Sequence, residues 1–337
     1  MAFDVVMLLV SLGLILLASV IFTNAIEVLG QRLGMHQGAV GSILAAVGTA
    51  LPETVIPLIA ILWIRDEQAK QVAVGAIAGA PFMLSTLAFF VTGAAVLGYA
   101  GLGRRARVMD ADVRVVARDL TFFLVLYGAA ILTTFVHDRM AVRIPIAIGL
   151  VAAYLVYLKV TLSSKAEEMA DVERLYLCRL VRAGPSAALT AVQLGVALAV
   201  MVGGGHMFVG YVETVSTELG ISALVLSLII TPVATELPEK FNSVIWVGRN
   251  KDTLAIGNIT GAMVFQCSFP VAFGVVGTPW DLLADHGVTL VSALLAMTSA
   301  AIALVWVKAR RTLNPFALLV GGALYAVFLT YLLTHMR

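Results

Sequence analysis

Ten long apolar stretches run along the chain, each near or above the roughly 20 residues that a helix needs to cross a bilayer. Polar residues gather between the stretches and do not alternate with apolar ones inside them, which favours helices over the strands of a barrel. The predicted spans are residues 5–30, 38–64, 72–99, 119–136, 142–160, 186–212, 221–248, 253–277, 286–307 and 313–334.

The composition agrees with this pattern and excludes several other classes of protein. Of 337 residues, 61% are hydrophobic and 12% are charged, about half the charged share of a soluble domain. Such a chain is too apolar to be disordered and lacks the dense basic face that nucleic-acid binding requires. Two cysteines exclude a disulfide scaffold. The sequence predicts an all-α, multi-pass membrane protein with the lipid bilayer as its surroundings and no nucleic-acid partner.

The distribution of Lys and Arg predicts the orientation. Sixteen of them fall on one side, in the segments around residue 32 and in 104–118, 159–182, 249–251 and 308–311. Five fall on the other side: Arg65, Lys70, Arg139, Arg143 and Arg337. Because basic loops stay in the cytoplasm, we expect a protein of the cell inner membrane whose termini both lie on the outer side and whose central loop is cytoplasmic.

The chain contains an internal repeat. When it is shifted by 186 positions, residues 21–53 lie over 207–239 without a gap, and ten of the 33 pairs are identical. Both copies end in Thr-x-Leu-Pro-Glu. We therefore expect a first five-helix repeat over 1–160, a cytoplasmic linker over 161–185 and a second repeat over 186–337. An odd number of spans inverts the second repeat, an arrangement typical of secondary transporters.

Prolines fall inside several spans, and two of them stand beside acids. A proline within a helix frees a backbone carbonyl, which in lipid must find another partner. We therefore predict helices that are broken at the midplane, and carbonyl oxygens beside carboxylates favour a cation site over simple kinks. The prolines in question are Pro52, Pro57, Pro81, Pro232, Pro238 and Pro270.

Three acids fall in mid-span, where each costs about 2.5–3.5 kcal/mol on insertion scales. They are Glu53, Glu236 and Glu239, and with Lys240 they carry a net charge of −2. One divalent or two monovalent cations would neutralise that charge. Alternatively, Lys240 is itself the counter-charge and the site is weaker for divalent ions.

Other residues are assigned to the membrane surface. Glu27 and Glu213 stand near span ends, where an interfacial role is favoured over a role in cation access. The four tryptophans also fall near span ends and predict interface anchors, namely Trp63, Trp246, Trp280 and Trp306.

The motifs resemble those of the cation/calcium exchanger superfamily, in particular its sodium/calcium exchanger membrane domain. That family carries Gly-Thr-Ser-Leu-Pro-Glu and then Gly-Asn-x-x-Gly-Ser-Asn-x-x-Asn in each half. Here the first motif spans 48–53 and 234–239, and the second spans 75–84 and 257–266. The resemblance implies calcium coordination by Glu53 and Glu239, with Thr49 and Thr235 in the family's threonine positions. It also implies an outside N-terminus and a cytoplasmic central loop.

The departures from the family pattern concern the coupling ion. The serine before Leu-Pro-Glu is Ala50 in one copy and Glu236 in the other. Most polar positions of the second motif are apolar: Ala76, Ala80, Pro81 and Leu84 in the first half, Ala262 and Met263 in the second. Asn258 and Gln266 remain as oxygen ligands. Because those polar groups hold sodium in the family, both sodium and proton coupling stay open.

The sequence thus predicts a secondary active antiporter that exchanges Ca²⁺ for Na⁺ or H⁺ by alternating access, with inorganic cations as substrates and no resident cofactor. The alternative is a proton-coupled exchanger of Mg²⁺ or another cation. Neither an Asp pair nor a Ser/His or metal constellation points to an intramembrane hydrolase, so no enzyme is expected, and the inverted repeat disfavours a channel. The predicted cation ligands are Glu53, Glu239, Glu236, Thr49, Thr235, Asn258 and Gln266.

Overall fold

The computed structural model describes residues 1–32, 51–136, 138–163, 174–180 and 186–335. Within these ranges every regular element is a helix, and the only bridge between extended residues pairs Met109 with Leu313. Eight helices are long and apolar enough to cross a membrane, and two shorter apolar helices cover Glu53–Ile64 and Ala223–Val233. The predicted all-α, multi-pass membrane fold is therefore confirmed, whereas the ten-span inverted repeat stays a prediction.

The first half of the chain runs back and forth through the bundle. The helix of residues 67–101 is continuous but contains the π-helical turn η3. The elements are α1 (Ala2–Arg32), α4 (Leu51–Ile59), η2 (Ala60–Ile64), α5 (Glu67–Met83), η3 (Leu84–Ala88), α6 (Phe89–Gly101), α7 (Val113–Leu132), η4 (Thr133–Val136) and α8 (Met140–Ser163).

The second half begins with a short helix of the linker region. Local signals place its helix ends: Ser186 and Ser222 accept hydrogen bonds from Leu189 N and Val225 N, and Gly220 ends a helix in the left-handed conformation. The elements are α9 (Tyr176–Leu180), α10 (Ala187–Leu219), α11 (Ala223–Gly248), α12 (Asp252–Gln266), α13 (Phe269–Gly277), η5 (Asp285–Gly287), α14 (Val288–Arg310) and α15 (Pro315–His335).

Helices α5 and α11 cross in close contact at the centre of the bundle. A Cβ atom on Gly79 would overlap the carbonyl oxygen of Leu228, and one on Gly75 would overlap that of Leu224. Ser227 Oγ donates to the Val72 carbonyl at 2.8 Å in the same interface. The Leu228 carbonyl is the one that loses its helical donor at Pro232, so glycine lets α5 approach α11 at the proline.

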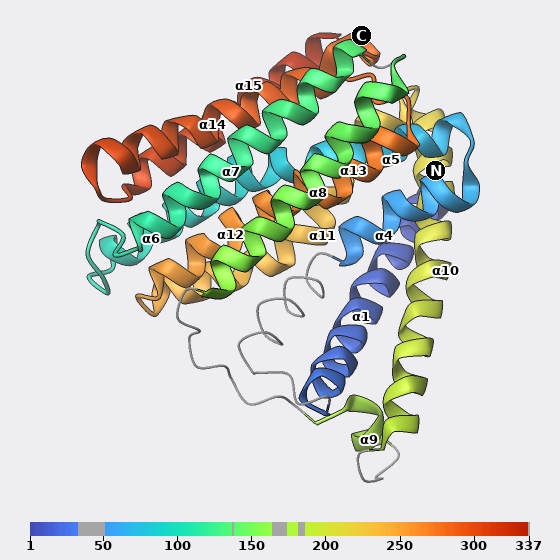
Figure 1. Cartoon of the computed structure of the whole chain (residues 1–337), viewed down its shortest axis with the longest axis horizontal. Helices are drawn as coiled ribbons and strands as arrows, with labels where there is room; N and C mark the ends of the chain where they lie inside the picture. Colours follow the sequence, from blue (N-terminus) through green and yellow to red (C-terminus); the bar gives the residue numbers. More distant parts are fainter. Residues whose placement is uncertain (33–50, 137, 164–173, 181–185, 336–337) are drawn as a thin grey trace.

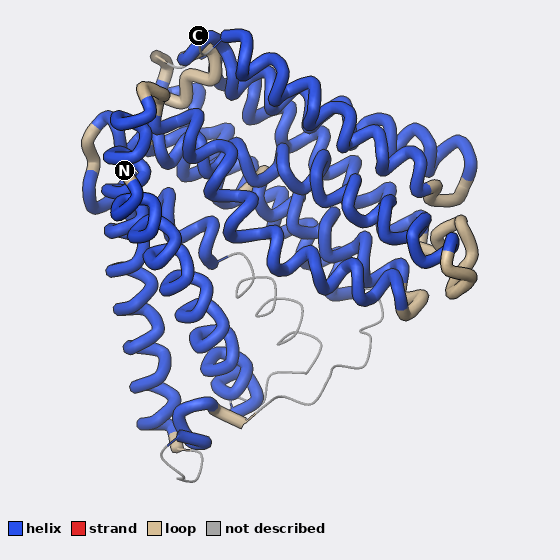
Figure 2. The backbone as a smooth tube through the Cα atoms, turned by 180° about the vertical axis from the view of Figure 1, so that it is seen from behind, coloured by secondary structure: helices blue, strands red, loops and turns tan. Residues whose placement is uncertain are grey.

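Helices α1 and α10 form an antiparallel pair that leans away from the other helices (Figures 1 and 2). At one end the N-terminal amine of Met1 lies 2.9 Å from Glu218. At the other end Gln193 Nε2 donates to Asn24 Oδ1 at 3.0 Å, and both side chains are buried. Each of the two helices is the predicted first span of its repeat, so the structure pairs corresponding elements of the two halves.

The short helix α9 fastens this pair at the linker end. Tyr176 N donates to Asn24 Oδ1 at 3.0 Å, and Leu177 N donates to Gln193 Oε1 at 2.8 Å. These amides belong to the first turn of α9, where a backbone N–H has no acceptor inside the helix. One buried amide cluster therefore joins α1, α9 and α10.

The prediction of broken helices is wrong for one motif. Helix α11 continues without interruption through Pro232 and Pro238, so the backbone of residues 234–240 is helical and not unwound. The interruptions occur later along each half. The π-helical turn η3 begins at Leu84, and a non-helical turn at Cys267 and Ser268 separates α12 from α13. These two places correspond in the sequence repeat.

One side chain bonds to the end of α12 at the second interruption. Pro270 has no N–H to offer the Gln266 carbonyl, which is four residues earlier. Ser268 Oγ donates to the Val264 carbonyl at 2.7 Å and to the Phe265 carbonyl at 2.9 Å. The chain therefore bends directly after Gln266, the residue that ends the family-like motif of the second half.

The tryptophan prediction is wrong for one residue. Trp63 is 70% exposed and its role as an anchor stays a prediction, but Trp280 is fully buried. Its Nε1 donates to the Ala130 carbonyl at 3.0 Å, so the turn after α13 folds inward against α7. Trp280 is therefore a core residue, and its indole N–H has the internal partner that burial requires.

Candidate functional site

The structure brings together two of the predicted ligands from opposite halves of the chain. Glu53 on α4 is 4% exposed and Gln266 at the end of α12 is 1% exposed. Gln266 Nε2 donates to Glu53 Oε1 at 2.9 Å. A buried carboxylate is costly unless it is paired or hydrogen-bonded, and the amide supplies one such bond. This contact defines the centre of the candidate site.

Helix α11 places two further predicted ligands inside the protein. Thr235 and Glu236 are both buried, and α11 packs against α4, which carries Glu53. Thr235 Oγ1 donates to the Thr231 carbonyl at 2.9 Å, one turn earlier. Because its proton is used within the helix, the lone pairs of this hydroxyl remain available as acceptors. Thr235 could therefore offer an oxygen to a cation without losing its own bond.

Of the remaining predicted ligands, only Asn258 has a side chain that the structure describes. Thr49 lies outside the described residues. Glu239 belongs to α11, but its side chain is outside the described part of the chain, as is that of Lys240. Asn258 is half-buried and stands eight residues before Gln266, about 12 Å along the helix axis. Asn258 is thus at another level of the bundle from Gln266, and its role stays a prediction.

The chemistry of the described part of the site is that of oxygen ligands. Carboxylate, amide and hydroxyl oxygens suit hard cations, whereas soft metals prefer sulfur and nitrogen. Among the side chains that the structure describes, no three His, Cys, Asp or Glu residues gather in a group that could hold a metal ion. The free cysteines, Cys178 and Cys267, are both buried. To bind a divalent ion, the site would need carboxylates from more than one segment of the chain.

The sequence reasoning missed a buried acid that contacts α12 away from Gln266. Asp119 on α7 is 1% exposed and accepts from Thr260 Oγ1 at 2.8 Å. Arg118 Nη2 also donates to Asp119, at 2.9 Å, and its guanidinium lies 5.3 Å from the centre of the Tyr157 ring. Asp119 is the first residue of the predicted span 119–136, and an acid at the start of an apolar span was the available signal, because such residues rarely face lipid. The Asp119–Thr260 bond fastens α12, and with it Gln266, to α7.

Comparisons of the sequence with known proteins find a family match in both halves. The profile described as "Sodium/calcium exchanger protein" matches residues 3–162 and 189–336, one segment on each side of the linker. The chain is also similar to "Inner membrane protein YrbG" of Escherichia coli strain K12. The two are 26% identical over 280 residues, covering 82% of this chain and 80% of that protein.

Comparison of the structure with solved structures gives the same fold. The structure of "H+/Ca2+ Exchanger CAX" superposes with a TM-score of 0.70 and 16% identity over 98% of this chain and 82% of that chain. A structure of "the sodium-calcium exchanger NCX_Mj" superposes with a TM-score of 0.56 and 18% identity over 98% of both chains. At these identities the likeness concerns the fold.

Proposed function

The chain belongs to the sodium/calcium exchanger protein family, and from this premise we propose that it exchanges Ca²⁺ for Na⁺ or H⁺ across the membrane. The resemblance that its motifs indicated is thereby confirmed at the level of the family. The observation that supports the proposal most directly is the buried contact between Glu53 and Gln266. It joins the two repeats at the residues where the motifs predict ion binding.

In this proposal Glu53 supplies negative charge, and Glu236 and Glu239 supply the rest. Thr235 contributes hydroxyl lone pairs, and Thr49 is its counterpart in the first repeat. Gln266 has both an amide N–H and an amide oxygen, so it can donate to Glu53 between transport events and present its oxygen to a bound cation. A hard divalent ion such as Ca²⁺ accepts such a mixed set of oxygens.

Alternating access would come from movement of the α1–α10 pair. This pair leans away from the remaining helices and is tied together at both ends by Met1–Glu218 and Asn24–Gln193. Sliding or tilting of the pair across α4 and α11 would open the site first to one side and then to the other. An inverted repeat supplies two similar conformations for such a cycle.

The buried surface of α5 and η3 bears on the counter-ion. Ala76, Ala80 and Leu84 occupy positions that are polar in sodium-coupled relatives, and each is at most 1% exposed. These side chains have no oxygen to offer a sodium ion. This favours H⁺ over Na⁺ as the counter-ion and keeps a proton-coupled exchanger of Mg²⁺ as the second candidate.

Flux in proteoliposomes tests the proposal. Vesicles loaded with Ca²⁺ receive either a Na⁺ gradient or a pH gradient, and the same series is repeated with Mg²⁺. We expect Ca²⁺ flux driven by one of the two gradients, abolished in Glu53→Gln and retained in Glu67→Gln, an exposed acid outside the site. Equal flux in Glu53→Gln and wild type would contradict the site, and flux of Mg²⁺ alone would select the second candidate.

A further inference from the structure

One end of the bundle carries a strong excess of positive charge. The turns α6–α7, α11–α12 and α14–α15 meet there (Figure 1), and residues 102–114, 249–252 and 308–314 contain nine Lys or Arg against three Asp. The formal net charge of the whole chain is only +2, so acids must be in excess elsewhere. We call the exposed basic residues of these turns the basic rim: Arg104, Arg107, Arg114, Arg249, Lys251, Lys308, Arg310 and Arg311.

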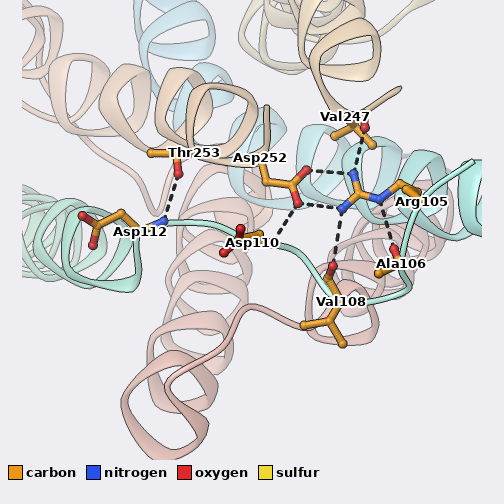
Figure 3. A network of polar contacts seen from close by, with 8 residues as sticks. All are labelled: Arg105, Ala106, Val108, Asp110, Asp112, Val247, Asp252 and Thr253. Atoms are coloured by element: carbon orange, nitrogen blue, oxygen red, sulfur yellow. Dashed lines mark hydrogen bonds and ion pairs between the residues drawn. The ribbon is translucent and has the colours of Figure 1, made fainter. Parts of the chain in front are cut away.

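A buried ion pair holds two of the three turns together. Arg105 donates from Nη1 and Nη2 to the two carboxylate oxygens of Asp252 at 2.7 and 2.6 Å, and both side chains are 2% exposed. Arg105 Nη1 also reaches the Val247 carbonyl at 2.9 Å, and Asp110 N donates to Asp252 at 2.8 Å (Figure 3). Asp112 N donates to Thr253 Oγ1 at 3.0 Å in the same network.

The third turn is attached through the backbone bridge between Met109 and Leu313. The basic rim is therefore a fixed surface and not a set of independent loops. Two of the three acids in these turns are already paired: Asp252 with Arg105, which is not part of the rim, and Asp112 with Arg114 of the rim at 3.3 Å. Rules of membrane insertion account for basic residues in loops, but they do not require that the loops be fastened into one surface.

The rim lies where lipid headgroups would lie. Its residues stand at or within a few positions of the ends of the apolar helices Glu67–Gly101, Val113–Val136, Asp252–Gly277, Asp285–Arg310 and Pro315–His335. The α6–α7 turn also exposes two apolar side chains beside its arginines, with Leu102 69% and Val108 49% exposed. Alternating apolar and basic side chains at this depth suit the boundary between acyl chains and headgroups.

We propose that the basic rim binds the headgroups of anionic phospholipids. Arginine presents a planar fork of donors that matches phosphate oxygens, and six of the eight rim residues are arginines. Basic residues held at the membrane surface attract anionic lipids, and each adds to the attraction within a Debye length. The rim would thereby keep a shell of anionic lipid around the end of the bundle that the Lys and Arg count predicts to be cytoplasmic.

Native mass spectrometry of the purified full chain in neutral detergent tests the proposal. Phosphatidylglycerol and phosphatidylcholine are offered as an equal mixture, and the lipids retained on the protein are counted. We expect wild type to prefer phosphatidylglycerol and Arg104→Gln/Arg107→Gln to lose about tenfold or more of that preference. The matched control Arg65→Gln/Arg139→Gln, at the other end of the bundle, should retain it.

Two further measurements test whether the positive charge of the rim selects the lipid. Arg104→Lys/Arg107→Lys should keep most of the preference, and raising the salt concentration should weaken it in wild type. Wild type that retains both lipids equally, or whose preference is indifferent to salt, would overturn the proposal even if the variants fail to fold. Complete displacement of phosphatidylglycerol by millimolar inorganic phosphate would also overturn it, because the rim would then be a site for soluble anions.

Discussion

Gln266 Nε2 donates a hydrogen bond to Glu53 Oε1 at 2.9 Å, joining side chains that lie 213 positions apart in the chain. The two residues come from α12 and α4, in opposite halves of the sequence, and both are buried. The amide donor lies beside the carboxylate that is proposed to bind the cation. Gln266 therefore gives Glu53 a neutral partner, whose N–H a bound cation would have to replace.

The first prediction replaces this amide with an acid. In Gln266→Glu, two carboxylates face each other, so we expect a loss of about 2–3 kcal/mol of stability in cation-free buffer. Added Ca²⁺ should relieve the repulsion, because a ligand that binds only the folded protein stabilises it. Thermal unfolding, with and without Ca²⁺, measures both effects, and the Ca²⁺-induced rise in Tm should exceed that of wild type.

Gln68→Glu is the matched control, because Gln68 is exposed on α5 and takes no part in the proposed site. It should change neither the Tm in cation-free buffer nor the response to Ca²⁺. If Gln266→Glu unfolds at the wild-type temperature and gains no more from Ca²⁺ than wild type, the contact with Glu53 does not stabilise the cation-free protein.

The sequence predicted the acids of this site better than their partners. Glu53 and Glu236 stand out because a carboxylate within an apolar span is costly, and both are buried as expected. Gln266 was found through its motif position, but its donation to Glu53 depends on how two segments 213 residues apart pack. Periodicity and spacing carry no information on that packing, so the direction of the amide could not be predicted.

A second prediction concerns the crossing of α5 and α11. In Gly79→Ala, the new Cβ would overlap the Leu228 carbonyl oxygen and approach Pro232 Cγ to 2.6 Å. Backbone must move to relieve an overlap of this kind, and overpacking typically costs about 1–3 kcal/mol. We expect a lower Tm and less folded protein in fluorescence-detected size-exclusion chromatography.

Gly98→Ala provides the comparison for that variant. Gly98 lies on α6, in the same continuous helical span, and a Cβ there would meet nothing within 4 Å. Its replacement should leave Tm unchanged or raise it slightly, because alanine favours helix. Equal behaviour of the two variants would show that the close crossing does not limit stability.

The third prediction breaks the buried pair of Arg105 and Asp252. Arg105→Met leaves the Asp252 carboxylate buried without its guanidinium, which typically costs about 3–5 kcal/mol. The double variant Arg105→Met/Asp252→Leu should recover part of the loss, because an apolar pair avoids an uncompensated charge. Unfolding of both variants is followed by thermal melting in one detergent.

The exposed pair of Arg114 and Asp112 serves as the reference for this prediction. Arg114 is 87% exposed, and surface pairs contribute about 0–1 kcal/mol. Arg114→Met should therefore leave Tm almost unchanged. A loss in Arg105→Met no larger than in Arg114→Met would mean that the network in Figure 3 does not stabilise the fold.

The prolines show a second limit of prediction from sequence. Pro232 and Pro238 predicted an unwound segment, yet α11 remains helical through both. The freed Leu228 carbonyl faces Gly79 on a neighbouring helix, and this arrangement depends on the α5–α11 crossing. Only tertiary packing decides whether a proline kinks, breaks or is accommodated. The interruption at Leu84 comes after Pro81, and the interruption at Cys267 comes before Pro270. A proline therefore lies near each interruption but does not identify the residue at which the helix is interrupted.

Two adjacent glycines of α10 allow the proposed joint movement of α1 and α10 to be tested, because they face different helices. A Cβ on Gly204 would lie 3.5 Å from Leu14 Cβ on α1, within the Cβ–Cβ range of a disulfide. A Cβ on Gly205 would overlap Ile59 Cδ1, the end of a side chain, and would lie 3.6 Å from Val55 Cγ1, with both residues on α4. One glycine therefore faces the partner within the pair, and the next faces the helix that carries Glu53.

Cross-linking these two contacts gives the fourth prediction, made in a Cys178→Ser/Cys267→Ser background. The Leu14→Cys/Gly204→Cys variant should transport at nearly the same rate in its oxidised and reduced forms. Its disulfide would join α1 to α10, which move together as one body in the proposal. A cross-link in Val55→Cys/Gly205→Cys should stop Ca²⁺ flux in proteoliposomes, and reduction should restore it, because it fastens the moving pair to the static part of the site. Each variant is its own control before and after reduction. Transport that survives the second cross-link, or that the first one abolishes reversibly, would contradict movement of α1 and α10 as a unit against α4.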